Sequence, residues 1–283
     1  MYKDPEAVPS YSKPRVRSFR RRPKHRRVRR RFKTPPGSRI VVPSFFTLMN
    51  LLSGFLAIIQ IHEGRLEYAC WLIVLAGFFD LLDGMMARLA RATSPFGVEL
   101  DSLSDIVSFG VAPGFLLYEF GLKELNTLGT ILAALPAITG AVRLARYNVF
   151  QEDHAQKGNF SGLPIPVMAL TVVAFILTFD DVSWFDRLSM GRLSVLIPLV
   201  IALSALMISN ISYEALPRPS KAFVRAHPWK ALLLFIATML VLVFHETGLF
   251  LVLSLYIISG PVRMVVELFF DPMHVQEEDY LRG

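Results

Sequence analysis

Four aspartates interrupt an otherwise apolar stretch of the sequence, and their spacing is suited to chemistry. They form two pairs, Asp80 with Asp83 and Asp101 with Asp105. Residues three or four apart lie on the same face of a helix, so each pair shares one face. The connector between the pairs contains Pro95, which allows the two helices to turn back on each other. We therefore predict that both pairs converge in one pocket.

Four ionised carboxylates repel one another unless cations lie between them. Arg88 and Arg91 are the basic residues close in sequence, and hard divalent cations with oxygen ligands fit the site better. Two such ions bridged by shared carboxylates would clamp a pyrophosphate and stabilise its charge during displacement. Small residues at Gly84, Ala87 and Gly97 allow close helix packing or the close approach of a flat ligand. The alternative is the ion or proton pathway of a transporter.

The full pattern is Asp-x2-Asp-Gly-x2-Ala-Arg-x8-Gly-x3-Asp-x3-Asp over residues 80–105. It resembles the signature of the CDP-alcohol phosphatidyltransferases at all eight fixed positions. The resemblance implies a membrane enzyme with two Mg²⁺ or Mn²⁺ ions. Such an enzyme transfers a phosphatidyl group from a CDP-linked lipid to an alcohol and releases CMP.

The resemblance also implies a role for each residue. Asp80, Asp83 and Asp101 would bind one metal ion, and Asp80, Asp101 and Asp105 would bind the other. Asp105 would also take the proton from the acceptor hydroxyl. The residues expected to bind the CDP-linked lipid, here CDP-diacylglycerol, are Gly84, Ala87, Arg88, Ser94, Gly97, Thr47 and Asn50.

Softer patterns concern the acceptor alcohol. Four segments resemble the integral-membrane phosphatidylserine synthase branch of the family, namely residues 43–50, 106–113, 143–148 and 160–166. They predict L-serine as the acceptor. Arg143 and Arg146 support this prediction, because a guanidinium binds a carboxylate or a phosphate through two hydrogen bonds. They could instead face lipid headgroups, and the acceptor could be glycerol 3-phosphate, inositol phosphate or choline.

The composition predicts the elements that carry these residues. Of the 283 residues, 53% are hydrophobic and 19% are charged, and the mean hydropathy is +0.45. Soluble domains average about 45–50% apolar and about 25% charged residues. We expect an all-α membrane protein, a bundle of about eight transmembrane helices. They lie near residues 43–61, 69–90, 99–120, 127–147, 163–179, 193–211, 230–245 and 248–269.

The charge distribution predicts three regions. Residues 1–40 carry 15 Lys and Arg against two acids, whereas the remainder has a net charge of −6. We expect residues 1–39 to be a basic, disordered, cytoplasmic tail that contacts anionic lipid headgroups and does not bind nucleic acid. Residues 40–212 would form a catalytic domain of six helices. Residues 213–283 would add two transmembrane helices and a short C-terminal tail.

The loops predict the orientation. With the N-terminus in the cytoplasm, eight spans place 11 Lys and Arg beyond the tail on the cytoplasmic side and four outside. We therefore expect a multi-pass protein of the cell (inner) membrane with both termini in the cytoplasm. We also expect a homodimer.

Overall fold

The computed structural model describes residues 38–90, 94–153, 160–180, 190–213 and 228–270. All of them belong to Pro35–Gly283, the larger of the two units into which the chain divides. The predicted basic tail therefore lies almost entirely outside the described residues, and so does the predicted C-terminal tail.

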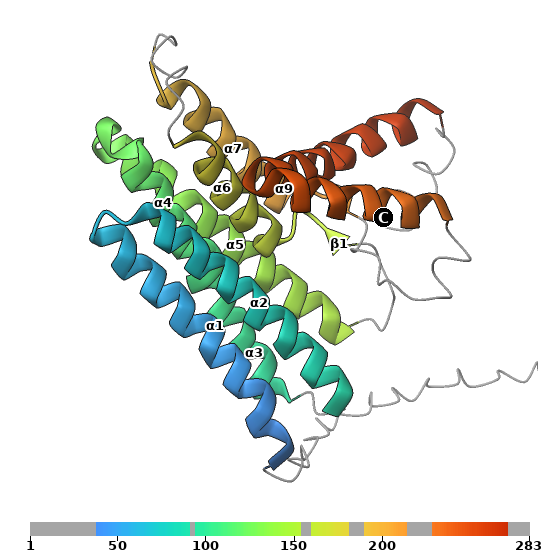
Figure 1. The fold of residues 1–283 in the computed structure, drawn as a ribbon. Helices are drawn as coiled ribbons and strands as arrows, with labels where there is room; N and C mark the ends of the chain where they lie inside the picture. Colours follow the sequence, from blue (N-terminus) through green and yellow to red (C-terminus); the bar gives the residue numbers. More distant parts are fainter. Residues whose placement is uncertain (1–37, 91–93, 154–159, 181–189, 214–227, 271–283) are drawn as a thin grey trace, which may run out of the picture. The chain divides into compact units, whose positions relative to one another are not determined.

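The described part is helical (Figure 1). Its longer helices are α1 (Ser38–His62), α2 (Leu66–Ala90), α3 (Pro95–Asp105), α4 (Ala112–Phe120), α5 (Thr127–Asp153), α6 (Ile165–Phe179), α7 (Leu193–Ile208) and α9 (Pro228–Phe270). Short turns complete it, namely the π-helical η1 (Ile106–Val111) and the 3₁₀-helical η2 (Leu122–Leu125). The only strands among the described residues are β1 (Phe160–Ser161) and β2 (Ser212–Tyr213), which pair antiparallel.

The turn before α3 is shorter than predicted. The sequence placed Pro95 in the connector and the next helix near residue 99, but α3 begins at Pro95. Ser94 is the N-cap, and its side chain accepts a hydrogen bond of 3.0 Å from the backbone N–H of Gly97. Proline is well suited to the first turn of a helix, where its missing N–H costs nothing. Pro95 therefore starts the helix and does not prolong the connector.

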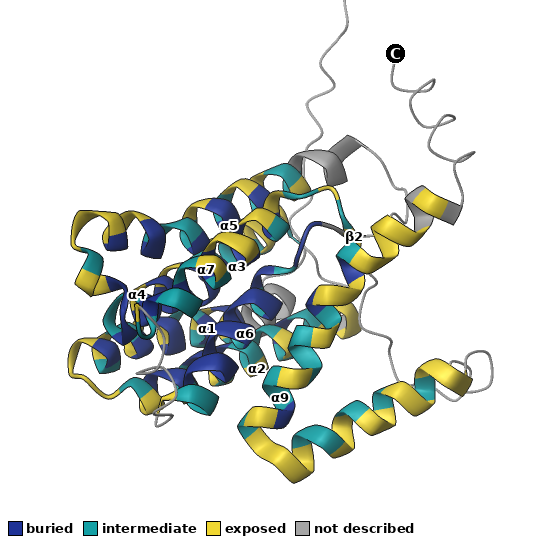
Figure 2. Ribbon diagram, turned by 90° about the horizontal axis from the view of Figure 1, so that it is seen from above, coloured by how far each residue is buried: buried dark blue, intermediate teal, exposed yellow. Residues whose placement is uncertain are grey.

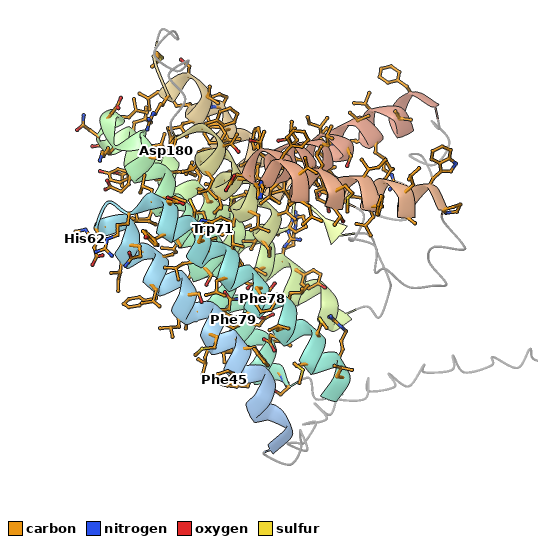
Figure 3. All side chains as sticks on the ribbon, viewed as in Figure 1. Phe45, His62, Trp71, Phe78, Phe79 and Asp180 are labelled. Carbon is orange, nitrogen blue, oxygen red and sulfur yellow. The ribbon has the colours of Figure 1, made fainter. Side chains whose placement is uncertain are left out.

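Small residues bring the central helices close together. A Cβ atom at Gly110 of η1 would lie 3.0 Å from the Cα atom of Ala137 in α5, and one at Gly114 would collide with the Ala133 carbonyl. Large apolar side chains face outward on other helices, including Phe45 of α1 and Phe78 of α2 (Figure 3). Close packing through small residues with apolar side chains outside is typical of membrane helix bundles.

The structure is that of an all-α, multi-pass membrane protein. Within the described residues, five helical stretches are long and apolar enough to cross a membrane, against eight predicted crossings. The difference arises because α6 and α7 contain only 15 and 16 residues, and because α9 joins the last two predicted spans. The backbone of α9 is nevertheless broken at His245 (φ 46°, ψ −116°), which lies where the sequence placed the end of the seventh span.

Helix α9 differs from the others in its burial. Only 6% of the apolar stretch of α9 is buried inside the structure. The corresponding share is 28% to 50% for the other four long apolar helical stretches. Figure 2 shows exposed residues along most of its length. It contacts mainly α6, and to a lesser extent β2.

Candidate active site

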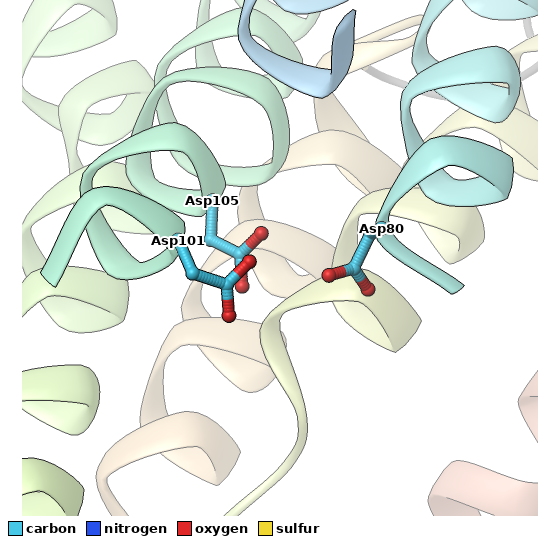
Figure 4. A group of neighbouring side chains, drawn as sticks. All are labelled: Asp80, Asp101 and Asp105. Carbon is cyan, nitrogen blue, oxygen red and sulfur yellow. The ribbon is translucent and has the colours of Figure 1, made fainter. Parts of the chain in front are cut away.

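Three of the four aspartates meet between α2 and α3. Asp80 projects from α2 toward Asp101 and Asp105, which lie one turn apart on α3 (Figure 4). One carboxylate oxygen from each lies within 4.8 Å of the other two. This is the convergence that the spacing predicted, although Asp83 lies outside the group of three.

Helix α1 holds two of the aspartates through neutral side chains. The Thr47 hydroxyl donates a hydrogen bond to Asp83 Oδ2, and Asn50 Nδ2 donates one of 3.1 Å to Asp105 Oδ1. Thr47 and Asn50 are three residues apart and therefore lie on one face of α1. Both are buried. The sequence assigned them to lipid binding, and the structure gives them aspartates as partners.

Two serines that the sequence analysis passed over fix α1 in this position. Ser104 donates a 3.0 Å hydrogen bond to the backbone carbonyl of Thr47, and Ser108 donates one of 2.9 Å to that of Asn50. A Cβ atom at Gly54 would collide with Ser108, so the two segments lie in direct contact. A signal was present, because the two serines are four residues apart and flank Asp105 in an apolar stretch.

The helix changes its winding immediately after Asp105. Asp105 is the last residue of α3, and the π-helical turn η1 follows it. Such turns are rare within helices and are frequent at functional sites. The transition places Asp105, Ser108 and the close contact of Gly110 with α5 within two turns of each other.

The negative charge of the cluster is not compensated by basic side chains among the described residues. The ion pairs found there join Arg65 to Glu63, Lys123 to Glu119 and Arg192 to Asp180, none of which belongs to the cluster. Clustered carboxylates without a basic partner suit hard divalent cations, which prefer oxygen ligands. The donor set therefore fits the metal site that the family resemblance implies.

The remaining residues predicted to bind the CDP-linked lipid lie toward the C-terminal end of α2 and at the start of α3. Arg88 is exposed, and its guanidinium lies beside Gly84 one turn earlier, because a Cβ atom there would be 3.3 Å from Arg88 Nη1. Ala87 is partly buried at the same end of α2. Ser94 and Gly97 are joined to each other by the N-cap hydrogen bond of α3.

Arg143 and Arg146 lie one turn apart on α5 but have different surroundings. Arg146 Nη1 donates a 3.1 Å hydrogen bond to the carbonyl of Ile208, and Nη2 donates one of 3.4 Å to that of Ser209. It thus caps the C-terminal end of α7, where carbonyls lack helical partners. Arg143 is buried, and its Nε atom has no hydrogen-bond partner among the residues that the structure describes.

The helix that carries the buried Arg143 packs against the turn that follows Asp105. Arg143 belongs to α5, and α5 contacts η1, which begins directly after Asp105. Asp101 lies on the same helix as Asp105, whereas Asp80 lies on α2.

The comparison with protein families agrees with this arrangement. Residues 40–197 match the family model for the CDP-alcohol phosphatidyltransferases. The chain belongs to this family. The matched region runs from the beginning of α1 into α7. It contains the four aspartates of the motif as well as Arg143 and Arg146.

Several curated members of the family are similar to the chain over most of its length. CDP-diacylglycerol–serine O-phosphatidyltransferase of Helicobacter pylori (strain ATCC 700392 / 26695) is 33% identical over 81% of this chain and 94% of its own. Its Bacillus subtilis (strain 168) counterpart is 31% identical over 66% and 98%. Archaetidylserine synthase of Methanothermobacter thermautotrophicus is 38% identical over 62% and 70%.

Proposed function

We propose that the protein transfers the phosphatidyl group of CDP-diacylglycerol to L-serine, giving phosphatidylserine and CMP. The observation that carries the proposal is the group of Asp80, Asp101 and Asp105, with the buried Arg143 on α5, the helix that packs against the turn after Asp105. The names of the similar family members support serine as the acceptor.

The aspartates are proposed to hold two divalent cations, Mg²⁺ or Mn²⁺. Asp80, Asp83 and Asp101 would bind one ion, and Asp80, Asp101 and Asp105 the other. Bound there, the ions would neutralise the pyrophosphate and stabilise the charge that develops on it. Thr47 and Asn50 orient the carboxylates of Asp83 and Asp105 for this task.

Asp105 is proposed to act as the general base. Asn50 engages its Oδ1 atom, so Oδ2 would accept the proton of the serine hydroxyl. The serine oxygen would then form a bond to the phosphorus that carries the diacylglycerol. The bond from that phosphorus to the oxygen of CMP would break, and CMP would leave. A general base needs hydrogen-bond reach of the proton it removes, and the grouping of Asp105 with Asp80 and Asp101 supports a role for it beside the reacting phosphate.

Arg143 is proposed to bind the serine carboxylate. It is buried, its Nε atom has no hydrogen-bond partner in the described part of the chain, and its helix packs against the turn after Asp105. Arg146 donates to the carbonyls at the end of α7 and is the less suitable of the two. Gly84, Ala87, Arg88, Ser94 and Gly97 are proposed to accommodate the CDP moiety, with Arg88 near a phosphate.

The membrane arrangement follows from the same reasoning. We propose eight crossings, with α6 and α7 as short spans and α9 as two, because the break at His245 divides its 43 residues. The active site would then face the cytoplasm, with both termini on that side of the cell membrane. Residues 1–39 would contact anionic headgroups, residues 40–212 would form the catalytic domain, and the protein would be a homodimer.

The deciding experiment is an acceptor assay on the purified protein. It receives CDP-diacylglycerol, Mn²⁺ or Mg²⁺ and one alcohol at a time: L-serine, glycerol 3-phosphate, inositol phosphate or choline. CMP release and the lipid product are both measured. We expect a lipid product only when the alcohol is L-serine, and we expect that product to be phosphatidylserine. A lipid product formed only with one of the other alcohols would refute the serine assignment.

The alternative of a cation-coupled transporter is tested with the same preparation. A transporter would carry a solute into liposomes without releasing CMP. The enzyme is expected to release CMP only when donor lipid, acceptor and divalent metal are all present. Addition of EDTA should abolish that release, and excess Mn²⁺ should restore it.

A further inference from the structure

Two buried serines bind the backbone of α1 beside the aspartates. The Ser104 hydroxyl donates a 3.0 Å hydrogen bond to the Thr47 carbonyl, and the Ser108 hydroxyl donates one of 2.9 Å to the Asn50 carbonyl. The relative exposure of both serines is 0%. Each carbonyl lies inside α1, and its oxygen has a second lone pair for the serine besides the one used within the helix. A serine that binds a neighbouring helix in this way fixes where that helix lies.

The same two residues of α1 hold aspartates with their side chains. The Thr47 hydroxyl donates to Asp83 Oδ2, and Asn50 Nδ2 donates to Asp105 Oδ1 at 3.1 Å. Each residue of α1 therefore accepts a hydrogen bond from a serine at its carbonyl and donates one to an aspartate from its side chain. Two separate relays result, each running from a serine through a residue of α1 to an aspartate: Ser104–Thr47–Asp83 and Ser108–Asn50–Asp105.

The π-helical turn η1 brings the two serines into step with α1. Ser104 lies in α3 and Ser108 in η1, four residues later, whereas their two acceptors on α1 are three residues apart. In a regular α-helix four residues advance about 6 Å and three advance about 4.5 Å. In η1 the Ala112 N–H bonds to the Val107 carbonyl five residues earlier, so the turn holds more residues and advances less per residue. The wider turn thereby reduces the mismatch between the two helices.

The packing beside Ser108 is tight. A Cβ atom at Gly54, which lies one turn after Asn50 on α1, would collide with the Oγ and Cα atoms of Ser108. Helix α1 and the turn η1 are therefore in direct contact at this point. A buried hydrogen bond in such a contact is costly to lose, and its loss would allow α1 to shift.

We propose that Ser104 and Ser108 are positioning residues that act on different parts of the proposed reaction. Through α1, Ser104 holds Asp83 for metal binding, and Ser108 holds Asp105 for removal of the acceptor proton. This inference rests on the proposed function, in which Asp83 is a metal ligand and Asp105 is the general base. Small displacements of such groups lower the rate, so the hydrogen bonds behind them contribute to catalysis as well as to packing.

The kinetic test compares Ser104→Ala with Ser108→Ala at limiting and at saturating Mn²⁺. Ser108→Ala should lower kcat about three- to five-fold at saturating Mn²⁺, which is the usual effect of one hydrogen bond between membrane helices. Ser104→Ala should lower activity at limiting Mn²⁺ and should change kcat by less than about 1.5-fold at saturation. Ser53→Ala is the control, because the buried Ser53 donates to the Met49 carbonyl within α1.

Metal binding is measured without any substrate, by electron paramagnetic resonance of Mn²⁺ on the purified protein. Ser104→Ala should weaken Mn²⁺ binding about three- to five-fold, and Ser53→Ala should leave it unchanged. Unchanged Mn²⁺ binding in Ser104→Ala would overturn the role of Ser104. A kcat of Ser108→Ala equal to that of Ser53→Ala would overturn the role of Ser108.

Double variants identify the route of each effect. Adding Ser108→Ala to Asn50→Ala should change kcat by less than about 1.5-fold, because the side chain that the serine positions is gone. Adding Ser104→Ala to Thr47→Ala should likewise leave Mn²⁺ binding unchanged. Effects that multiply in the double variants would overturn the relays. Equal losses in every constant together with a lower melting temperature would also overturn them, since that pattern is structural.

A conservative variant covers the case in which Ser108→Ala does not insert. Ser108→Cys keeps a weaker donor at the same position, because a thiol donates less strongly than a hydroxyl. Its kcat should lie between that of Ser53→Ala and one-fifth of that value, with both KM values unchanged. A kcat equal to that of Ser53→Ala in a folded protein would count against the role of Ser108.

The outcomes separate this inference from the proposed function. If the wild type forms no phosphatidylserine, the serine assignment fails, while Mn²⁺ binding still tests the role of Ser104. If the wild type uses serine and both alanine variants match Ser53→Ala in kcat and in Mn²⁺ binding, the relays are overturned and the proposed function stands. A loss of Mn²⁺ binding in Ser104→Ala with a loss of kcat in Ser108→Ala supports both.

Discussion

The aspartates between α2 and α3 and the arginines of α5 differ in how their charges are satisfied. At the aspartates, like charges gather and receive hydrogen bonds from the neutral side chains of Thr47 and Asn50. At the arginines, Arg146 is bound to backbone carbonyls, whereas Arg143 is buried with an unpartnered Nε atom. One region lacks cations and the other lacks an anion.

The comparison shows how a folded chain prepares a site for reagents of opposite charge. A buried charge without a partner is costly, so an uncompensated charge in a native structure points to a partner supplied from outside. Divalent metal ions would complete the aspartates, and the acceptor carboxylate would complete Arg143. Substitutions of the aspartates and of the arginines test these two expectations separately, and the aspartates should show the largest effect.

The largest effect is expected at the aspartates. Asp80→Asn, Asp101→Asn and Asp105→Asn should each lower kcat about a thousand-fold or more, because each removes a charge that stabilises the reacting pyrophosphate. CMP release measures kcat, and electron paramagnetic resonance of Mn²⁺ measures metal binding without substrate. Asp180→Asn is the matched control, because Asp180 is exposed and pairs with Arg192. Near wild-type turnover at saturating Mn²⁺ in any of the three variants would contradict that residue's assignment.

The next effect separates the two arginines. Arg143→Ala should raise the serine KM about ten- to a hundred-fold, since a hydrogen bond to a charged group contributes about 1.5–3 kcal/mol. Arg146→Ala should change it by less than about two-fold. Steady-state kinetics with each substrate varied in turn checks both. An unchanged serine KM in Arg143→Ala would show that Arg143 does not bind the serine carboxylate.

A smaller effect is expected from the residue that orients the general base. Asn50→Ala should lower kcat about ten-fold with little change in either KM, because Asp105 loses the donor to its Oδ1 atom. Ser53→Ala on the same helix is the control, since the Ser53 hydroxyl donates to the Met49 carbonyl one turn earlier and not to an aspartate of the cluster. Equal kcat values for the two variants would show that Asn50 does not act through Asp105.

Arg146 should affect stability more than catalysis. Arg146→Ala removes donors to the last carbonyls of α7 and should lower the melting temperature by about 2–4 °C. Thermal unfolding in detergent measures the change, and Arg65→Ala, whose partner is the exposed Glu63, provides the comparison. A melting temperature equal to that of Arg65→Ala would show that Arg146 does not stabilise the C-terminal end of α7.

The smallest effect is expected from the basic tail. Deletion of residues 1–37, which precede α1, should change kcat and both KM values by less than about two-fold in detergent. The reason is that every residue placed at the site lies between Thr47 and Arg143. A folded, inserted truncation without activity would show that the tail contributes to catalysis.

Much of the site could be predicted because its residues are close in sequence. Asp101 and Asp105 lie one helical turn apart, and the period of the helix is enough to place them on one face. The pairing of Thr47 with Asp83 and of Asn50 with Asp105 could not be predicted in this way. These residues are 36 and 55 positions apart, so their contact depends on how α1 packs against α2 and α3.

The helix boundaries could likewise be predicted only in part from the sequence. The composition predicted eight apolar segments, but it could not show that α3 begins at Pro95 or that α9 continues across His245. A proline can end one element or begin the next, and the N-cap hydrogen bond of Ser94 decides which. Such bonds depend on the local backbone path and are absent from the hydrophobic pattern.

The sequence by itself determined the family, the membrane character and the aspartates that carry the proposed chemistry, because the motif is local and the apolar runs are long. Only the tertiary structure distinguished Arg143 from Arg146. The two are the same residue type on neighbouring turns of α5, and the sequence treats them alike. Their difference lies in what other segments bring to them: the end of α7 supplies carbonyls to Arg146, whereas Arg143 is buried and its Nε atom has no hydrogen-bond partner among the described residues. Packing between distant segments thus decided which arginine is left available to bind a ligand.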